Sequence, residues 1–142
     1  MQPIIYLFFD STCAEAFRFY AEVFGTSEEL VLMPASAAPG EEIPDLEGAS
    51  PDLIMHGAVK IGSGWVYGSD DLSGQGTAKM AGASINLSLP DEAETRRIYQ
   101  ALSAGGEVRM PLEPAFFAPL FSGFTDRFGV RWMVMQDDPP QT

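Results

Sequence analysis

The sequence predicts an α+β fold in which two βαβββ modules form one domain. The segment at 11–25, "STCAEAFRFYAEVFG", carries the start and stop signals of a complete helix. A similar segment, "PDEAETRRIYQALSAGG", follows at an offset of 79 residues, measured from Thr12 to Asp91. A chain of 142 residues has the usual size of one domain, so the two halves are expected to share a core.

The first helix is expected at 12–24. Thr12 and Glu15 have the S/T-x-x-E spacing in which two side chains cap free backbone N–H groups. Gly25 offers the left-handed residue that ends many helices. One face is apolar at spacings i, i+4, i+7 and i+11, formed by Cys13, Phe17, Tyr20 and Phe24.

The second helix is expected at 91–103. Asp91 and Glu94 take the places of Thr12 and Glu15, and Gly105-Gly106 follows the helix. The strand before each helix is expected to keep the same offset, with "IIYLFF" at 4–9 matching "ASINLS" at 83–88.

About three strands are expected after each helix. In module one, about 3–70, strands are predicted at 28–33, 53–62 and 65–70, with a Gly-Ser-Gly turn at 62–64. The Pro-, Gly- and acid-rich segment 34–51 separates the first two strands. A polar joint at 71–82 leads to module two, about 83–136, whose later strands are expected within 107–114, 116–126 and 130–136.

Charge and composition exclude several classes of function. The chain has 8 basic and 20 acidic residues and a net charge of −12, which disfavours nucleic-acid binding. No apolar run approaches the roughly 18 residues of a membrane span. The N-terminus lacks the features of a signal peptide, so a cytoplasmic protein is expected. Cys13 is the single cysteine, which excludes an internal disulfide, and its place on the apolar helix face predicts a packed thiol.

The doubled βαβββ pattern resembles the vicinal oxygen chelate superfamily, which includes glyoxalase I, ring-cleaving dioxygenases and bleomycin resistance proteins. Four segments resemble its PhnB-like branch, also described as 3-demethylubiquinone-9 3-methyltransferase-like: "YLFFDSTCAEAFRFYAEVFG", "IMHGAVKIG", "LSAGGEVRMPLEP" and "TDRFGVRWMV". The resemblance runs from about residue 3 to 136. It implies the glyoxalase/bleomycin resistance fold and leaves the reaction open, because one fold hosts many functions.

The resemblance also implies where a metal would bind. Superfamily members that hold a metal use two His and two carboxylates, or close variants, and the matching positions here fall near Ile5 or Tyr6, near Ser84 and near Met133. None of these residues is a His, Asp or Glu, so no metal and no cofactor are expected. Methyl transfer is not expected either, because no G-x-G-x-x-G loop follows a strand.

His56 is the single histidine and the candidate general base, because imidazole titrates near neutral pH. It shares a strand face with Lys60. That face either lines the trough of the sheet or contacts a neighbouring strand or solvent, and both interpretations stay open.

The predicted ligand-binding residues are polar or aromatic. Ser84 and Asn86 belong to an alternating strand with one polar face, a pattern that is equally typical of any half-buried strand. Aromatic residues can line an apolar pocket, although such residues also build cores, and the candidates are Tyr6, Trp65, Tyr67, Phe117 and Trp132. PhnB-like proteins carry Trp-Gly where this chain has Phe117-Ala118.

Three functions are compatible with the sequence. The first is binding of a small organic molecule in the trough of the sheet, without a metal and with or without catalysis. The second is a divalent-metal-dependent lyase, isomerase or dioxygenase with a non-standard ligand set, which the missing ligands disfavour. The third is a protein-interaction module that uses the acidic loop 34–51. A homodimer is expected, because a small sheet leaves edges and apolar residues to cover.

Overall fold

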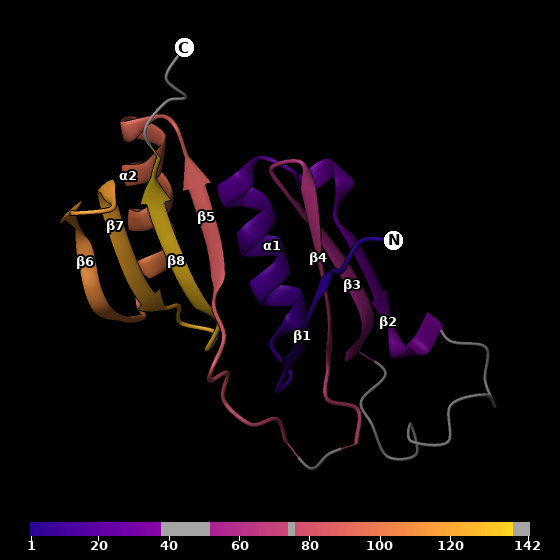
Figure 1. Cartoon of the computed structure of the whole chain (residues 1–142). Helices are drawn as coiled ribbons and strands as arrows, with labels where there is room; N and C mark the ends of the chain where they lie inside the picture. The colour runs from indigo at the N-terminus through magenta and orange to yellow at the C-terminus, as the bar shows by residue number, and fades with distance from the viewer. Residues whose placement is uncertain (38–51, 74–75, 138–142) are drawn as a thin grey trace. The chain divides into compact units, whose positions relative to one another are not determined.

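The structure is a computed structural model that describes residues 1–37, 52–73 and 76–137. The chain divides into two compact units, Met1–Ala78 and Lys79–Thr142, which we call module one and module two. Each has one helix and one four-stranded sheet, and each is described by itself (Figure 1). Within the described residues, no helix has the length and apolar character needed to span a membrane. The predicted single domain and its joint at 71–82 stay predictions.

Module one begins with strand β1 (Ile5–Phe9) and helix α1 (Cys13–Phe24). Strands β2 (Val31–Pro34), β3 (Ile54–Ile61) and β4 (Gly64–Asp70) follow. The strand order in the sheet is β1-β4-β3-β2, in which β1 runs parallel to β4 and the other neighbours are antiparallel. The βαβββ order predicted from the sequence is therefore confirmed for this module.

Module two repeats this topology. Strand β5 (Ile85–Leu89) precedes helix α2 (Glu92–Ser103), and strands β6 (Glu107–Ala115), β7 (Ala118–Thr125) and β8 (Arg131–Gln136) follow. Figure 1 shows the order β6, β7, β8, β5 across the sheet, with α2 on one side of it. The parallel pair is again the first and last strands, β5 and β8.

The repeat is less regular than the sequence predicts. Both helices have 12 residues and keep the offset of 79, but the parallel ladders end at Phe9 in module one and Leu89 in module two, an offset of 80. The predicted match of 4–9 with 83–88 is thus wrong by one residue, because the connection from strand to helix is one residue shorter in module two. By this register Tyr6 corresponds to Asn86, and Ser84 lies before β5.

Helix caps differ between the modules. Asp91 accepts a hydrogen bond from the backbone N–H of Glu94 at 2.9 Å, which is the first half of the predicted box, whereas the Glu94 carboxylate accepts from Arg97. Thr12 makes no side-chain cap bond, so the capping box predicted for α1 is wrong. Asp70, at the end of β4, accepts from the backbone N–H of Cys13 at 2.9 Å and from that of Ile54 at 2.8 Å. This buried carboxylate therefore joins α1, β3 and β4.

The segment after α1 also differs from the prediction. Gly25 ends the helix in the left-handed conformation, with φ of 71°. Ser27–Glu29 then forms a short 3₁₀ turn, so strand β2 begins at Val31 and not at 28. Ala35–Ala37 forms a second 3₁₀ turn. The rest of the predicted acidic loop, 38–51, lies outside the described residues.

Each helix packs on one face of its own sheet. In module one, Phe17 and Tyr20 are fully buried and Phe17 meets Phe9 edge to face at 5.7 Å. The ring of Phe17 lies over Gly57 and Gly68, which are register partners on β3 and β4. In module two, Tyr99 of α2 meets Phe124 of β7 at 5.7 Å. Among the described residues, no helix of the same module covers the opposite face of either sheet, and we call it the open face.

Candidate functional site

Aromatic side chains cover the open face of module one. Because side chains alternate along a strand, Leu7 and Phe9 of β1 point toward α1 and are buried, whereas Tyr6 and Phe8 lie on the open face, 40% and 65% exposed. Tyr6 is the register partner of Tyr67 on β4. An exposed group of aromatic rings on a sheet is typical of a surface that binds something apolar.

His56 lies among these rings. Its Nδ1 is 3.2 Å from the hydroxyl of Tyr6, and the two ring centres are 5.8 Å apart. The ring of Tyr67 meets the imidazole nearly edge to face, with ring centres 5.1 Å apart. Three side chains from β1, β3 and β4 therefore form one cluster, although they are distant in the sequence.

The Tyr6–His56 bond fixes what the imidazole offers to a ligand. A neutral imidazole has one N–H and one acceptor nitrogen. A phenol O–H is a stronger hydrogen-bond donor than the N–H of a neutral imidazole, so the favoured arrangement has the Tyr6 hydroxyl donating to Nδ1. Nε2 then carries the proton. Among the described residues, Nε2 of His56 has no hydrogen-bond partner.

Trp65 extends the open face along β4. It lies two residues before Tyr67 and so on the same face, and it is 38% exposed, while Val66 between them is buried. Trp65 is the register partner of Lys60, the charged residue predicted to share a face with His56. Lys60 forms an ion pair with Glu29 at 3.6 Å.

The open face of module two has a different character. Asn86 is exposed and its register partner on β8 is Met133, which in turn faces Gly123 on β7. Where module one has the phenols of Tyr6 and Tyr67, module two thus has an amide and a thioether. Ser84 is half-buried just before β5. The candidate ligand-binding residues Ser84 and Asn86 therefore belong to module two, whereas the His56 cluster belongs to module one.

Two further candidates lie elsewhere in module two. The structure places Trp132 in the core, fully buried, with its indole N–H donating to Asp126 at 2.8 Å. Strand alternation puts Trp132 on the α2 side, so it does not line the open face. Phe117 lies at the turn between β6 and β7, 53% exposed, and its ring contacts Phe121 at 5.0 Å.

The available donors do not fit the metal site of the superfamily. No group of three His, Cys, Asp or Glu side chains comes together within residues 1–37, 52–73 and 76–137. Cys13 is fully buried, and that burial, followed by the charge of Asp70, raises the pKa of its thiol to about 12. A protonated, buried thiol is no metal ligand. In the part of the chain that the structure describes, His56 is bonded to the phenol of Tyr6 and contacts the ring of Tyr67, and neither is a carboxylate or imidazole of the kind that Zn²⁺ and Fe²⁺ sites use.

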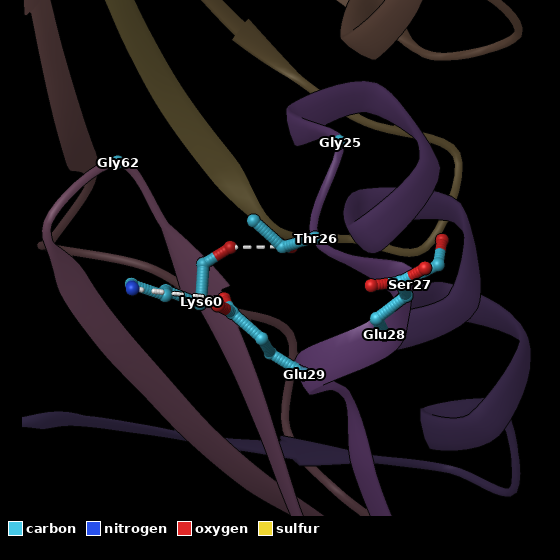
Figure 2. Close-up of a pocket in the computed structure, with 7 residues that line it drawn as sticks. All are labelled: Gly25, Thr26, Ser27, Glu28, Glu29, Lys60 and Gly62. Atoms are coloured by element: carbon cyan, nitrogen blue, oxygen red, sulfur yellow. Dashed lines mark hydrogen bonds and ion pairs between the residues drawn. The ribbon is translucent and has the colours of Figure 1, made fainter.

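A shallow hollow of about 500 Å³ lies at the end of α1. Figure 2 shows Thr26, Glu28 and Glu29 on one side of it and Lys60 and Gly62 of the β3–β4 hairpin on the other. The hydroxyl of Thr26 donates to the carbonyl of Lys60 at 2.7 Å. Because its one cation is already paired with Glu29, this hollow offers less chemistry than the His56 cluster.

The two four-stranded sheets, each with one helix, match the two-module glyoxalase fold, which is seen in a glyoxalase-related enzyme from Fulvimarina pelagi and in FosX from Mesorhizobium loti. Residues 2–135 match the model of the family described as 3-demethylubiquinone-9 3-methyltransferase, and the chain belongs to that PhnB-like family. The PhnB-like resemblance seen in the sequence is therefore confirmed.

Known relatives cover almost the whole chain. Protein YjdN of Escherichia coli (strain K12) is 31% identical over 145 residues, which span 96% of this chain and 97% of YjdN. The crystal structure of protein PA1353 from Pseudomonas aeruginosa matches with a TM-score of 0.85 at 37% identity, covering 98% of this chain and 99% of that one. A PhnB protein from Bacillus cereus matches in fold with a TM-score of 0.77 at 18% identity, over 96% and 99% of the two chains.

Sequence reasoning missed part of the open face. Phe8 is its most exposed aromatic residue on β1, and Met33 on β2 is the register partner of His56 and is 40% exposed. Phe8 could have been found from the sequence, because it lies two residues after Tyr6 and therefore on the same face of the strand. Nothing local indicates Met33, because its place beside His56 depends on the pairing of β2 with β3.

Proposed function

We propose that this protein binds a small organic molecule on the open face of module one, around His56, without a transition metal. The observation that carries the proposal is the Tyr6–His56–Tyr67 cluster, which sets one imidazole among exposed aromatic rings. Pockets for small molecules combine apolar walls with a few polar groups in this way.

The cluster favours a flat or apolar ligand that carries a hydrogen-bond acceptor. Phe8 and Trp65 offer ring surface, and each ring that becomes covered contributes through apolar burial. With Tyr6 donating to Nδ1, His56 offers the Nε2 proton to a carbonyl or similar oxygen. The role of general base needs the other tautomer, in which Tyr6 accepts from Nδ1 and Nε2 is free to take a proton.

Methyl transfer, which the family description names, has little support in this chain. Cofactors held between a strand and a helix usually need a glycine-rich connection. Here the connections are Asp10–Thr12 after β1 and Pro90–Asp91 after β5, and neither contains glycine. Gly62 and Gly64 lie in the β3–β4 hairpin instead.

The homodimer belongs to the same proposal. Val31, Met33 and Trp65 of module one and Met110 and Phe116 of module two are large apolar side chains with at least 38% exposure. Within residues 1–37, 52–73 and 76–137, no further strand pairs with the sheet edges β2 and β6. A symmetric dimer is the commonest way to cover such surfaces. The cytoplasmic location stays a prediction.

A thermal-shift screen in two arms tests the function. Protein treated with EDTA and dialysed is screened with a small-metabolite library, and in parallel with Zn²⁺, Fe²⁺, Ni²⁺ and Mn²⁺, because a ligand that binds the folded state raises Tm with its occupancy. We expect metabolite hits in the metal-free arm that disappear in His56→Ala.

Arg18→Ala is the matched control, because Arg18 is exposed on α1, on the other side of the sheet. Hits that stabilise His56→Ala as well as the wild type would place the ligand elsewhere. Elemental analysis of protein purified without chelator completes the test. One equivalent of zinc, iron or nickel that is lost in His56→Ala would support the metal-dependent alternative.

A further inference from the structure

Two arginines lie at one end of the open face of module two. Arg131 is the first residue of β8, and its neighbour Trp132 points toward α2, so Arg131 points to the open face. Its register partner on β7 is Thr125. Arg109 of β6 donates from Nη1 to the hydroxyl of Thr125. Thr125 therefore lies opposite Arg131 in the sheet and accepts a hydrogen bond from Arg109.

Neither arginine has a counter-ion in the described part of the chain. Lys60, Arg96 and Arg97 each form an ion pair there, whereas Arg109 and Arg131 do not. Arg18 and Lys79 form no ion pair there either, so what distinguishes Arg109 and Arg131 is that they flank the same residue, Thr125. Guanidinium groups without a carboxylate beside them keep N–H donors that an anion from solution can accept from.

The Nε of Arg131 gives a second, independent observation. This atom is buried and has no hydrogen-bond partner among the described residues. An unsatisfied buried donor is costly, and the cost is larger for a charged group. The backbone N–H of Arg131 is close to the sulfur of Met80 at 3.4 Å, so the segment before β5 covers this end of the strand without supplying an oxygen acceptor.

We propose that Arg131, Arg109 and Thr125 form a site for the oxyanion of a small molecule, a carboxylate or a phosphate group. Arginine offers a planar fork of N–H donors that matches both groups. Directly opposite residues of an antiparallel pair have Cβ atoms about 5 Å apart, so guanidinium groups held around Thr125 can reach one anion. The Thr125 hydroxyl accepts from Arg109, which leaves its own proton for the ligand.

Glu107 is the one carboxylate of β6 placed beside this site. It is the other register partner of Thr125, yet it forms no ion pair with either arginine among the described residues. Its charge opposes an incoming anion and therefore lowers the affinity of the site. The site is built from module two alone, so it stands or falls independently of the proposed function at His56.

NMR titration of the full-length, ¹⁵N-labelled protein tests the site. Inorganic phosphate and acetate are the two probes, and sodium chloride at the same ionic strength is the reference. We expect saturable shifts at the Nε–H of Arg131 and the amide of Thr125. A stronger response to phosphate assigns the site to phosphate groups, and an equal or stronger response to acetate assigns it to carboxylates.

Three variants make the test specific. Arg131→Gln and Arg109→Gln should each weaken binding by about tenfold or more, since each removes a charge-assisted contact. Glu107→Gln should strengthen it. Arg18→Gln removes one charge from α1 and should leave binding unchanged. If Arg131→Gln does not fold, the test rests on Arg109→Gln, whose side chain is exposed, and on the Arg131 Nε–H signal of the wild-type protein. No saturable shift at Nε, or equal loss in Arg18→Gln, would overturn the proposal.

Discussion

Gly68 is the position where helix α1 comes closest to the sheet of module one. A Cβ at this residue would lie 2.7 Å from Cζ of Phe17 and 2.9 Å from the carbonyl oxygen of Leu7. The Phe17 ring is fully buried, and the Leu7 carbonyl belongs to β1, which is paired with β4 at this position. Neither neighbour has free space to move into. Overpacking of this kind costs about 1–3 kcal/mol, so we expect Gly68→Ala to lower the free energy of unfolding by that amount.

Gly64→Ala is the matched control on the same strand. Its Cβ would meet nothing closer than the carbonyl oxygen of Ile61 at 3.9 Å, an ordinary contact. The substitution also reduces the freedom of the unfolded chain, so we expect a change of less than about 1 kcal/mol, in the stabilising direction. Gly57→Ala, with its Cβ 3.1 Å from Cδ2 of Phe17, should lie between the two.

Urea unfolding followed by circular dichroism measures all three variants. The midpoint should fall for Gly68→Ala with an unchanged m-value, because the surface exposed on unfolding stays the same. The double variant Phe17→Leu, Gly68→Ala should lose less stability than the sum of the two single variants. The contact with the Phe17 ring is then removed, while the contact with the Leu7 carbonyl remains. Equal stability of Gly68→Ala and Gly64→Ala would refute the placement of Phe17 against β4.

Three further predictions concern the caps, the thiol and assembly. Asp91→Ala should cost about 1 kcal/mol in urea unfolding, while Thr12→Ala should cost much less, because only Asp91 makes a cap bond; equal costs would contradict the described caps. Burial raises the pKa of the Cys13 thiol from its ordinary value of 9.0 to about 12 in the folded state, so its contribution to stability is present below pH 9.0 and is lost as pH rises toward 12. Cys13→Ala should remove this component from a pH series of unfolding curves, and a native thiol that reacts readily with DTNB at pH 8 would argue against its burial. Light scattering should give twice 15.4 kDa at micromolar concentration, and a monomer would disprove the dimer.

Local signals were sufficient for most of the fold. Helix periodicity and terminal glycine placed both helices within one residue. These features depend on neighbours a few residues apart, which the sequence shows directly.

The errors come from contacts between distant residues. Thr12 is placed as a helix cap by its spacing from Glu15. The backbone N–H of Cys13 at the start of α1 donates instead to Asp70, which lies 57 residues away. Trp132 was a candidate because aromatic residues often line pockets. Its indole N–H donates instead to the buried Asp126, on the α2 side of the sheet. Which face of a strand receives the helix depends on the assembled sheet, and a single strand does not reveal it.

The same limit applies to the candidate site. The sequence indicated His56 as a candidate because of its chemistry. It did not show whether the imidazole lines the trough of the sheet or contacts a neighbouring strand or solvent. The bond to Tyr6 and the edge contact with Tyr67 depend on the order β1-β4-β3, which joins residues 6, 56 and 67 on one face. Arg131 and Arg109 were not singled out, because their shared link to Thr125 arises only when β6, β7 and β8 pair.

Chemical-shift mapping in metal-free protein tests the central claim most directly. A metabolite that raises Tm in the EDTA-treated screen is titrated into ¹⁵N- and ¹³C-labelled protein, and the signals of the His56 imidazole and the Trp65 indole are followed. We predict the largest shifts at His56, Tyr6, Tyr67 and Trp65, with Nε2 of His56 protonated in the complex. Largest shifts at the hollow around Thr26 and Lys60, or binding that appears only after a transition metal is added, would contradict the account.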